Sequence, residues 1–309
     1  MKYICRRLLL FVPTLLVLSF LVFVMLEMTP GSAASAVLDD ASSGTAAAAL
    51  CAQTRCDQPL LARYAGYLTD IVRGDFGVSA RTGRDVGAEL ILRLPHTLII
   101  SAAAILVALL IGGFIGVIAA VNCGTKLDTA ITVITSIGAS MPTFWVAMLL
   151  VSLFAVRLHW LPVFGMGEGF SHYVLPAAAV ALALIPGLTV LVRSSVIEVK
   201  QQAFISTAYG KGLASGHVYK RHVLPAAAVP IVTYVGMQSV HLIGTLVTIE
   251  VLFSLPGLGG LAVQAALDRD PMLLQGAVLL IATLTLCILL IVDIAVLLLD
   301  PRIRRESEY

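Results

Sequence analysis

Charged side chains are scarce in this sequence. Only 12% of its 309 residues are Asp, Glu, Lys or Arg, and 59% are hydrophobic, whereas a soluble domain carries about 25% charged residues. The net charge of +2 is small, and the basic residues form no stripe of the kind that binds nucleic acid. These shortages exclude an ordinary soluble domain and indicate that lipid is the solvent for most of the chain.

Catalytic signatures are missing as well. The sequence contains no His-Glu-x-x-His and no Gly-x-Ser-x-Gly, and no paired aspartates fall within its apolar stretches. An intramembrane enzyme, one alternative, needs a nucleophile and base or a metal set inside the membrane. A secondary transporter, the other alternative, usually shows internal repeats and ion-binding carboxylates, and no clear repeat is visible here. No metal-ligand set is predicted.

Long apolar runs are what the sequence does have. A helix needs about 20 apolar residues to cross roughly 30 Å of hydrocarbon. Six stretches reach this length: Leu8–Met28, Pro95–Val121, Thr129–Val156, Tyr173–Val192, Pro225–Phe253 and Met272–Leu299. The sequence therefore predicts an all-α membrane protein with six transmembrane helices.

The distribution of lysine and arginine predicts the orientation of these helices. With the N-terminus inside, twelve of these residues, including all five lysines, face the cytoplasm and eight face outward. Both termini are therefore predicted to be cytoplasmic. The first apolar run, about 20 residues long, exceeds the apolar region of about 7–15 residues in a secretory signal. It is therefore predicted to remain as the first span, with a cleaved signal as the alternative.

Three parts follow from this topology. Residues 1–28 form the cytoplasmic N-terminus and first span, 29–94 an external segment, and 95–309 a core with five spans and a cytoplasmic loop at 193–224. In the external segment, apolar residues from Leu60 to Ile71 recur at helical spacing, and a Gly-Asp-Phe-Gly sequence at 74–77 ends the pattern.

Two cysteines, Cys51 and Cys56, fall in the external segment. An oxidising compartment could join them in a disulfide. Their geometry does not follow from sequence, so a disulfide and two free thiols both stay open.

The cytoplasmic loop is longer than a connection requires, with about thirty residues where a handful suffices. Phe204, Thr207, Ala208 and Lys211 recur at i, i+3, i+4 and i+7, which predicts a short helix with a small apolar face. Such a helix suits close docking against a soluble motor. A helix resting on lipid headgroups is the alternative, and spacing alone leaves both open.

The end of this predicted helix and the return to the membrane are also visible. Gly210 and Gly212 are predicted to end the helix. Lys211 and Arg221 can pair with carboxylates of a partner, and Leu224-Pro225 leads the chain into the fifth span.

This loop resembles the EAA motif of ABC importer permeases. Ser206-Thr207-Ala208 stands where that motif has Glu-Ala-Ala, Gly212 is its glycine, and Leu224-Pro225 closes it. The run from Thr207 to Leu213 is similar to Thr-Ala-Arg-Ala-Lys-Gly-Leu of the dipeptide/oligopeptide/nickel permease family.

Other elements resemble the same family in the same order, so that the resemblance covers nearly the whole chain. They are Arg6-Arg7, Asp57-Gln58-Pro59-Leu60, Gly74–Gly77, Ser140–Phe144, Trp160–Pro162, Glu250–Gly259, Arg269-Asp270 and Asp300–Arg302. One departure is Thr29-Pro30-Gly31-Ser32, where the family usually has Pro-Gly-Asp-Pro.

The resemblance implies a type I ABC importer permease fold and the first permease subunit of a binding-protein-dependent importer in the bacterial inner membrane. The expected partners are a second homologous permease, two ATP-binding subunits, an external substrate-binding protein and the lipid bilayer, with no nucleic acid. ATP and Mg would be bound by the ATPases, and this chain would hold no cofactor and catalyse no covalent step. The expected cargo is di- or oligopeptides, with nickel or other metal chelates and glutathione-like compounds as the alternative.

The residues expected to couple to the ATPases lie in the loop. They are Phe204, Ser206, Thr207, Ala208, Gly210, Lys211, Gly212, Arg221, Leu224 and Pro225.

Polar residues inside spans are costly and are candidates for function. Glu250, Gln238 and His241 in the fifth span are candidates for the pathway or an outer gate, with bonding to a neighbouring helix as the alternative for Glu250 and His241. Met141-Pro142, with Phe144 beside it, is a candidate gate element at a proline kink. A kink that serves packing alone is the alternative.

Overall fold

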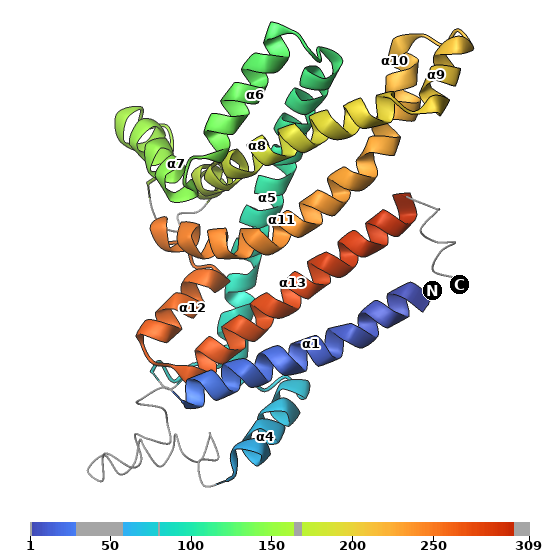
Figure 1. Cartoon of the computed structure of the whole chain (residues 1–309). Coiled ribbons are helices and arrows are strands. Elements are labelled where there is room, and N and C mark those ends of the chain that lie inside the picture. Colours follow the sequence, from blue (N-terminus) through green and yellow to red (C-terminus); the bar gives the residue numbers. More distant parts are fainter. Residues whose placement is uncertain (1, 29–57, 80, 164–168, 300–309) are drawn as a thin grey trace. The chain divides into compact units, whose positions relative to one another are not determined.

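The computed structural model describes residues 2–28, 58–79, 81–163 and 169–299 (Figure 1). Regular structure in these ranges is helical, apart from one isolated bridge between Val78 and Asp85. The chain divides into two compact units. Unit 1 comprises Met1–Ile4, Leu98–Leu255 and Cys287–Tyr309, and unit 2 comprises Cys5–Thr97 and Pro256–Leu286.

Within the ranges that the structure describes, five helices are long and apolar enough to cross a membrane. They are α1 (Lys2–Glu27), α5 (Val86–Val121), α8 (Ser171–Lys200), α11 (Leu224–Leu252) and α13 (Pro271–Leu299). Each contains or largely overlaps one of the predicted spans. Helix α5 begins nine residues earlier than its predicted span, and Pro95 lies inside it.

The shorter elements connect these helices. They are α4 (Leu60–Val72), α6 (Lys126–Ala139), α7 (Thr143–Leu150), the π-helix η1 (Val151–Arg157), α9 (Ala203–Gly210), α10 (Ser215–Val218), the π-helix η2 (Tyr219–Val223) and α12 (Leu258–Leu267).

The predicted third span, Thr129–Val156, is not one straight helix. Helix α6 and the α7–η1 segment meet at 98°. Pro142 has extended backbone angles, φ −62° and ψ 135°, and it is the N-cap of α7. Because proline has no N–H to donate to the preceding turn, α6 ends before it. The expected kink is therefore a full change of direction. The described part of the chain has six candidate spans if this bent pair counts as one.

Helix α8 is the centre of unit 1, where α6, α7 and α11 all pack against it. Helix α5 also approaches α8 closely, at Gly112 and Gly116. A Cβ at Gly116 would lie 2.7 Å from Val192 Cβ and 2.8 Å from the Thr189 carbonyl oxygen. The Gly-x-x-x-Gly spacing thus identifies a tight crossing, and the structure identifies α8 as its partner.

In unit 2, helix α4 packs on α1. The Tyr64 hydroxyl donates to the Leu16 carbonyl at 2.8 Å and lies 2.7 Å from Ser19 Oγ. The Tyr64 ring meets Phe20 edge-on, with centroids 5.0 Å apart. Burial raises the pKa of the neighbouring Tyr67 phenol, and Tyr64 adds to that effect. The helix predicted from the spacing of Leu60 to Ile71 is therefore confirmed, and positive φ angles at 74 and 77 follow its end.

A second cluster in unit 2 joins the first turns of α5 to α12 and α13. Its buried members include Val86, Leu90, Leu258 and Leu273. Asp270 caps α13 by accepting the Leu273 N–H at 3.2 Å. Its other oxygen accepts a hydrogen bond from the hydroxyl of Ser79, which lies in the loop before α5. Both apolar and polar contacts therefore stabilise this end of the unit.

Candidate functional site

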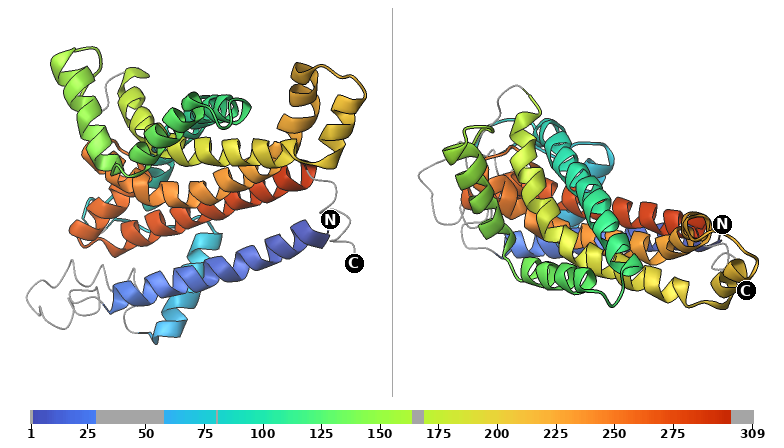
Figure 2. Two further views of the ribbon diagram at one scale, coloured as in Figure 1. Left: turned by 45° about the horizontal axis from the view of Figure 1, so that its top comes forward. Right: turned by 90° about the horizontal axis from the view of Figure 1, so that it is seen from above.

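The predicted cytoplasmic loop is largely helical. Helix α8 continues to Lys200, two helices α9 and α10 form a hairpin at its end, and η2 leads into α11 (Figures 1 and 2). The short helix predicted from the spacing of Phe204 to Lys211 is confirmed as α9, Ala203–Gly210.

A glycine ends α9, as predicted. Gly212 has φ +78°, a left-handed conformation that glycine adopts without steric cost. The Gly212 N–H donates to the Tyr209 carbonyl at 2.9 Å, and the Leu213 N–H donates to the Ala208 carbonyl at 3.4 Å. This pair of bonds is a Schellman motif, which fixes the direction in which the chain leaves α9. Gly210 is the last helical residue.

The inner face of α9 is buried in its own hairpin. Ile205 is 1% exposed and Ala208 is 8% exposed. Both belong to an apolar cluster that includes Val199 of α8 and the buried Val218 and Val223. The spacing in the sequence predicted one shared face for Phe204, Thr207 and Ala208. That prediction is wrong for Ala208, which faces inward. The shared core makes α9, α10 and the end of α8 one packed body.

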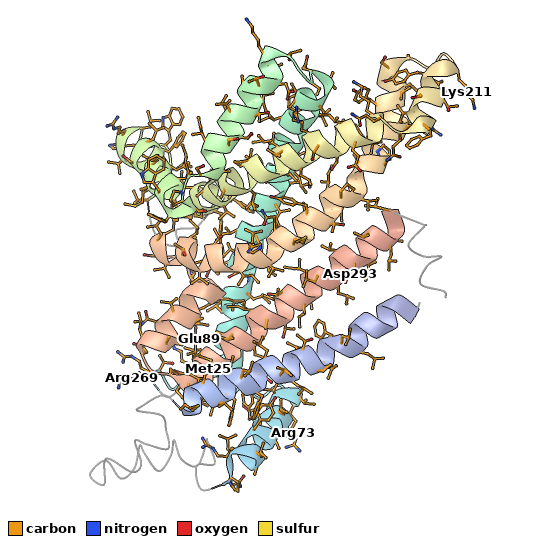
Figure 3. All side chains as sticks on the ribbon, viewed as in Figure 1. Met25, Arg73, Glu89, Lys211, Arg269 and Asp293 are labelled. Atoms are coloured by element: carbon orange, nitrogen blue, oxygen red, sulfur yellow. The ribbon has the colours of Figure 1, made fainter. Side chains whose placement is uncertain are left out.

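The outer face of α9 carries the other predicted residues. Phe204 is 44% exposed, and Ser206, Thr207 and Lys211 are also exposed. The Thr207 hydroxyl donates to the Ala203 carbonyl at 3.0 Å, so it is satisfied within the helix. Figure 3 shows Lys211 at the outer edge of the hairpin, directed away from α8.

The return to the membrane passes through η2. The Leu224 N–H donates to the Tyr219 carbonyl, five residues back. Pro225, which follows, has no N–H for the regular α-helical bond. Lys200 Nζ lies 5.9 Å from the centre of the Tyr219 ring, a cation–π distance that ties α8 to this turn. Arg221, Leu224 and Pro225 are exposed here.

A charged contact that the sequence reading missed joins α6 to α8. Arg193 Nε donates to Asp128 Oδ1 at 2.5 Å, and Arg193 Nη2 donates to Asp128 Oδ2 at 2.7 Å. Only 4% of the Asp128 residue is exposed. A signal existed in the predicted topology, which puts Asp128 at the start of one span and Arg193 at the end of another, on the same side of the membrane.

The three polar candidates in α11 lie in different surroundings. Glu250 is fully buried, whereas His241 is exposed. Gln238 is half-buried, and its Nε2 donates to the Tyr234 hydroxyl at 2.8 Å. The structure therefore does not bring these three side chains into one site.

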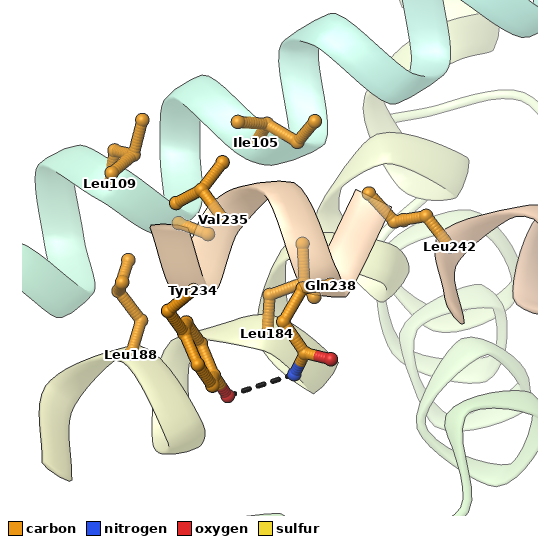
Figure 4. A pocket seen from close by; sticks show the side chains of 9 residues that line it. Ile105, Leu109, Leu184, Leu188, Tyr234, Val235, Gln238 and Leu242 are labelled. Carbon is orange, nitrogen blue, oxygen red and sulfur yellow. Dashed lines mark hydrogen bonds between the residues drawn. The ribbon is translucent and has the colours of Figure 1, made fainter. Parts of the chain in front are cut away.

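Gln238 lines a small cavity between α5, α8 and α11 (Figure 4). The cavity volume is about 20 Å³ and its walls are almost entirely apolar, with Leu184, Leu188 and Leu242 among them. Space of this size holds about one water molecule, so the cavity is too small for a peptide.

The gate candidates Met141, Pro142 and Phe144 lie at the bend between α6 and α7. All three are exposed, Phe144 to 50%. Near the same bend, a Cβ at Gly138 would lie 3.1 Å from Pro186 Cγ of α8. The bend is therefore in close contact with the central helix.

The remaining predictions concern cysteines and metals. Cys51 and Cys56 lie outside the described residues, while Cys123 and Cys287 are free and exposed. Within the described ranges, no group of three or more His, Cys, Asp and Glu side chains is placed to hold a metal ion.

Comparison with known proteins gives a consistent result. The profile of the family described as binding-protein-dependent transport system inner membrane component matches residues 112–305. A probable peptide ABC transporter permease protein, y4tP, of Sinorhizobium fredii is 32% identical over 98% of this chain and 99% of its own length.

Two further relatives cover the chain equally well. The oligopeptide transport system permease protein OppB of Haemophilus influenzae is 34% identical, again over 98% of this chain and 99% of its own. The glutathione transport system permease protein GsiC of Escherichia coli K12 is 33% identical, with the same coverage.

Among solved structures, an inward-facing form of the MetNI methionine ABC transporter is similar in fold. The TM-score is 0.60 at 17% identity, over 69% of this chain and 96% of the other. At this identity, the likeness bears on the fold alone.

Proposed function

Because this chain belongs to the family of binding-protein-dependent transport system inner membrane components, we propose that it forms half of a pathway for importing short peptides. As a member of that family, it is a multi-pass, non-catalytic permease subunit of an ABC importer in the inner membrane. Membership also removes the intramembrane enzyme and the secondary transporter as alternatives.

The proposed assembly has four kinds of subunit. This chain pairs with a second homologous permease, two ATPases bind from the cytoplasm, and a substrate-binding protein delivers cargo from outside. ATP and Mg are held by the ATPases. In this arrangement the bent pair α6 and α7–η1 counts as the third of six spans, both termini are cytoplasmic, and the fold is that of a type I importer.

The observation that carries the proposal is the α9–α10 hairpin. Its inner face is packed into the end of α8, while Phe204, Thr207 and Lys211 remain exposed on its outer face. An exposed aromatic ring and an exposed cation on one short helical hairpin are suited to a protein groove with a carboxylate at its rim. Because α9 is packed against α8, a force applied to that outer face is transmitted into the transmembrane helices. Ala208 supports this contact from inside the hairpin.

A stripe on α11 supports a pathway through unit 1. One face of this helix is exposed along its length, and Met237 on it is 63% exposed. The exposed residues on this face are Thr233, Met237, His241, Gly244 and Thr248. Polar side chains facing lipid are costly, so we assign this stripe to the pathway or to the second permease. Gln238 and Glu250 are turned toward other helices and stabilise α11 in this scheme.

Peptides are the preferred cargo because the transport systems of the three relatives share that chemistry. These are a probable peptide, an oligopeptide and a glutathione transporter, and glutathione is itself a small peptide. A glutathione-like compound is therefore the nearer alternative, and a nickel or other metal chelate is the more distant one.

Purification and uptake test the assembly and its cargo. The tagged chain should co-purify with two ATPases, and proteoliposomes holding the complex should take up labelled dipeptides when the binding protein and ATP are supplied. Phe204→Ala combined with Lys211→Gln should reduce the amount of ATPase that co-purifies at least several-fold. Lys220→Gln is the matched control, since Lys220 is an exposed lysine of the same loop. A wild-type chain that purifies without any ATPase contradicts the proposal.

A further inference from the structure

The contact between Asp128 and Arg193 is a two-pronged ion pair inside unit 1. The guanidinium donates through Nε and Nη2 to the two carboxylate oxygens, at 2.5 Å and 2.7 Å. Asp128 Oδ2 also accepts the Gly124 N–H at 2.9 Å. The carboxylate thus satisfies the turn before α6 and the arginine of α8 at once, with a geometry that lysine could not reproduce.

The pair lies where it can connect the hairpin to α6. Arg193 is on α8, next to Val192 and close to Val196 and Val199, which belong to the same apolar cluster as Ile205 of α9. The end of α8 and α9 therefore form one packed body. Asp128 lies in the first turn of α6, so the ion pair joins the start of α6 to that body.

The far end of α6 has a different attachment to α8. Gly138 allows α6 to approach Pro186, where an added Cβ would be 3.1 Å from Pro186 Cγ. Beyond Gly138, the chain bends by 98° into α7. Helix α6 is thus attached to α8 at both ends, by a charge pair next to the hairpin and by a close apolar contact next to the bend.

We infer that Asp128 and Arg193 are positioning residues that make α6 follow α8 and α9, so that movement of the hairpin reaches the bend at Met141-Pro142. This inference rests on the proposed function for the source of that movement, the ATPases. Neither residue needs to touch cargo or nucleotide. Without the pair, α9 still docks, but α6 is held at its bend end alone and no longer follows the motor fully.

The coupling ratio, which is peptide transported per ATP hydrolysed, tests this inference. Asp128→Asn should leave the amount of assembled complex and the basal ATPase rate near wild type. The ratio should fall roughly 2- to 30-fold, the range that corresponds to typical coupling energies. Asp128→Glu, which retains the carboxylate, should recover most of the ratio. Lys126→Gln, an exposed charge at the same helix end, should not change it.

A second substitution keeps the test decisive if Asp128→Asn fails to assemble. Arg193→Lys keeps the positive charge but loses the two-pronged donor, and it should give an intermediate ratio. A wild-type ratio in an assembled Asp128→Asn complex, or in Arg193→Lys when that is the variant that assembles, overturns the inference.

A distance measurement tests the shared movement without reference to cargo. Spin labels on Thr129→Cys and Glu198→Cys, both exposed positions on α6 and α8, are placed in a complex whose native cysteines are replaced. The distance should be the same without nucleotide and with ATP, and it should shift or broaden with ATP when Asp128→Asn is added. A wild-type distance that changes on ATP binding overturns the inference. A wild-type complex that takes up no peptide overturns only the proposed cargo, because this distance does not depend on cargo.

Discussion

Helices α8 and α11 have almost the same length, 30 and 29 residues, yet unit 1 uses them differently. In the most apolar 18 residues of α8, 56% are buried, against 22% in the most apolar 18 residues of the helical segment Ser215–Leu252, to which α11 belongs. Helix α8 is surrounded by α5, α6, α7 and α11, whereas α11 leaves a mixed polar stripe uncovered.

The contrast indicates that α8 has a structural role, whereas α11 has an exposed face that is available for function. Small residues such as Ala179 and Ala181 let neighbours approach α8 closely. On α11, Thr233, His241 and Thr248 are exposed, and lipid is a poor solvent for a histidine side chain. Changes in the close apolar packing around α8 should therefore affect folding, and changes on the stripe of α11 should affect transport.

The largest effect is expected at the crossing of α5 and α8. In Gly116→Ala the new Cβ would lie 2.7 Å from Val192 Cβ, and such overpacking should destabilise the permease by about 1–3 kcal/mol. Gly113→Ala is the matched control, because a Cβ there has no neighbour within 4 Å. Thermal unfolding of the purified protein measures both. Equal melting temperatures for the two variants would contradict the tight packing around α8.

A smaller effect is expected where α8 gives way to the hairpin. Gly212 has φ +78° with open space around it, so Gly212→Ala meets backbone strain alone, about 1–2 kcal/mol. Because the strain acts on the end of α9, stimulation of the ATPase by the binding protein should fall while the spans remain inserted. Gly216→Ala, at an ordinary φ and also in open space, is the control. If both variants stimulate alike, the cap does not position the docking helix.

The smallest effect on stability is expected on the stripe of α11. His241→Ala removes an exposed side chain and should change the free energy of unfolding by less than about 0.5 kcal/mol, while peptide uptake falls several-fold. Ser239→Ala serves as the control on the buried face, where the Ser239 hydroxyl bonds only to its own helix at the Val235 carbonyl. Unfolding curves and uptake assays are compared for both. Normal uptake by His241→Ala would remove His241 from the pathway.

Local sequence signals predicted much of the candidate site. The spacing of apolar residues identified α4 and α9, and the glycine at 212 identified the end of α9, because these features depend on a few neighbouring residues. Pro142 likewise predicted a kink. The angle of 98° did not follow from sequence, since it depends on where α6 and α7 each find a packing partner.

By itself, the sequence determined that the chain is apolar enough to span a membrane. It also determined that a helix terminated by Gly212 lies between the fourth and fifth predicted spans. The tertiary structure decided which faces are available. It turned Ala208 inward with Ile205, set Gly116 against Val192, and paired Asp128 with Arg193 across 65 residues of sequence. The physical reason is that helical periodicity places a residue on a face, but only packing between distant segments determines what that face meets.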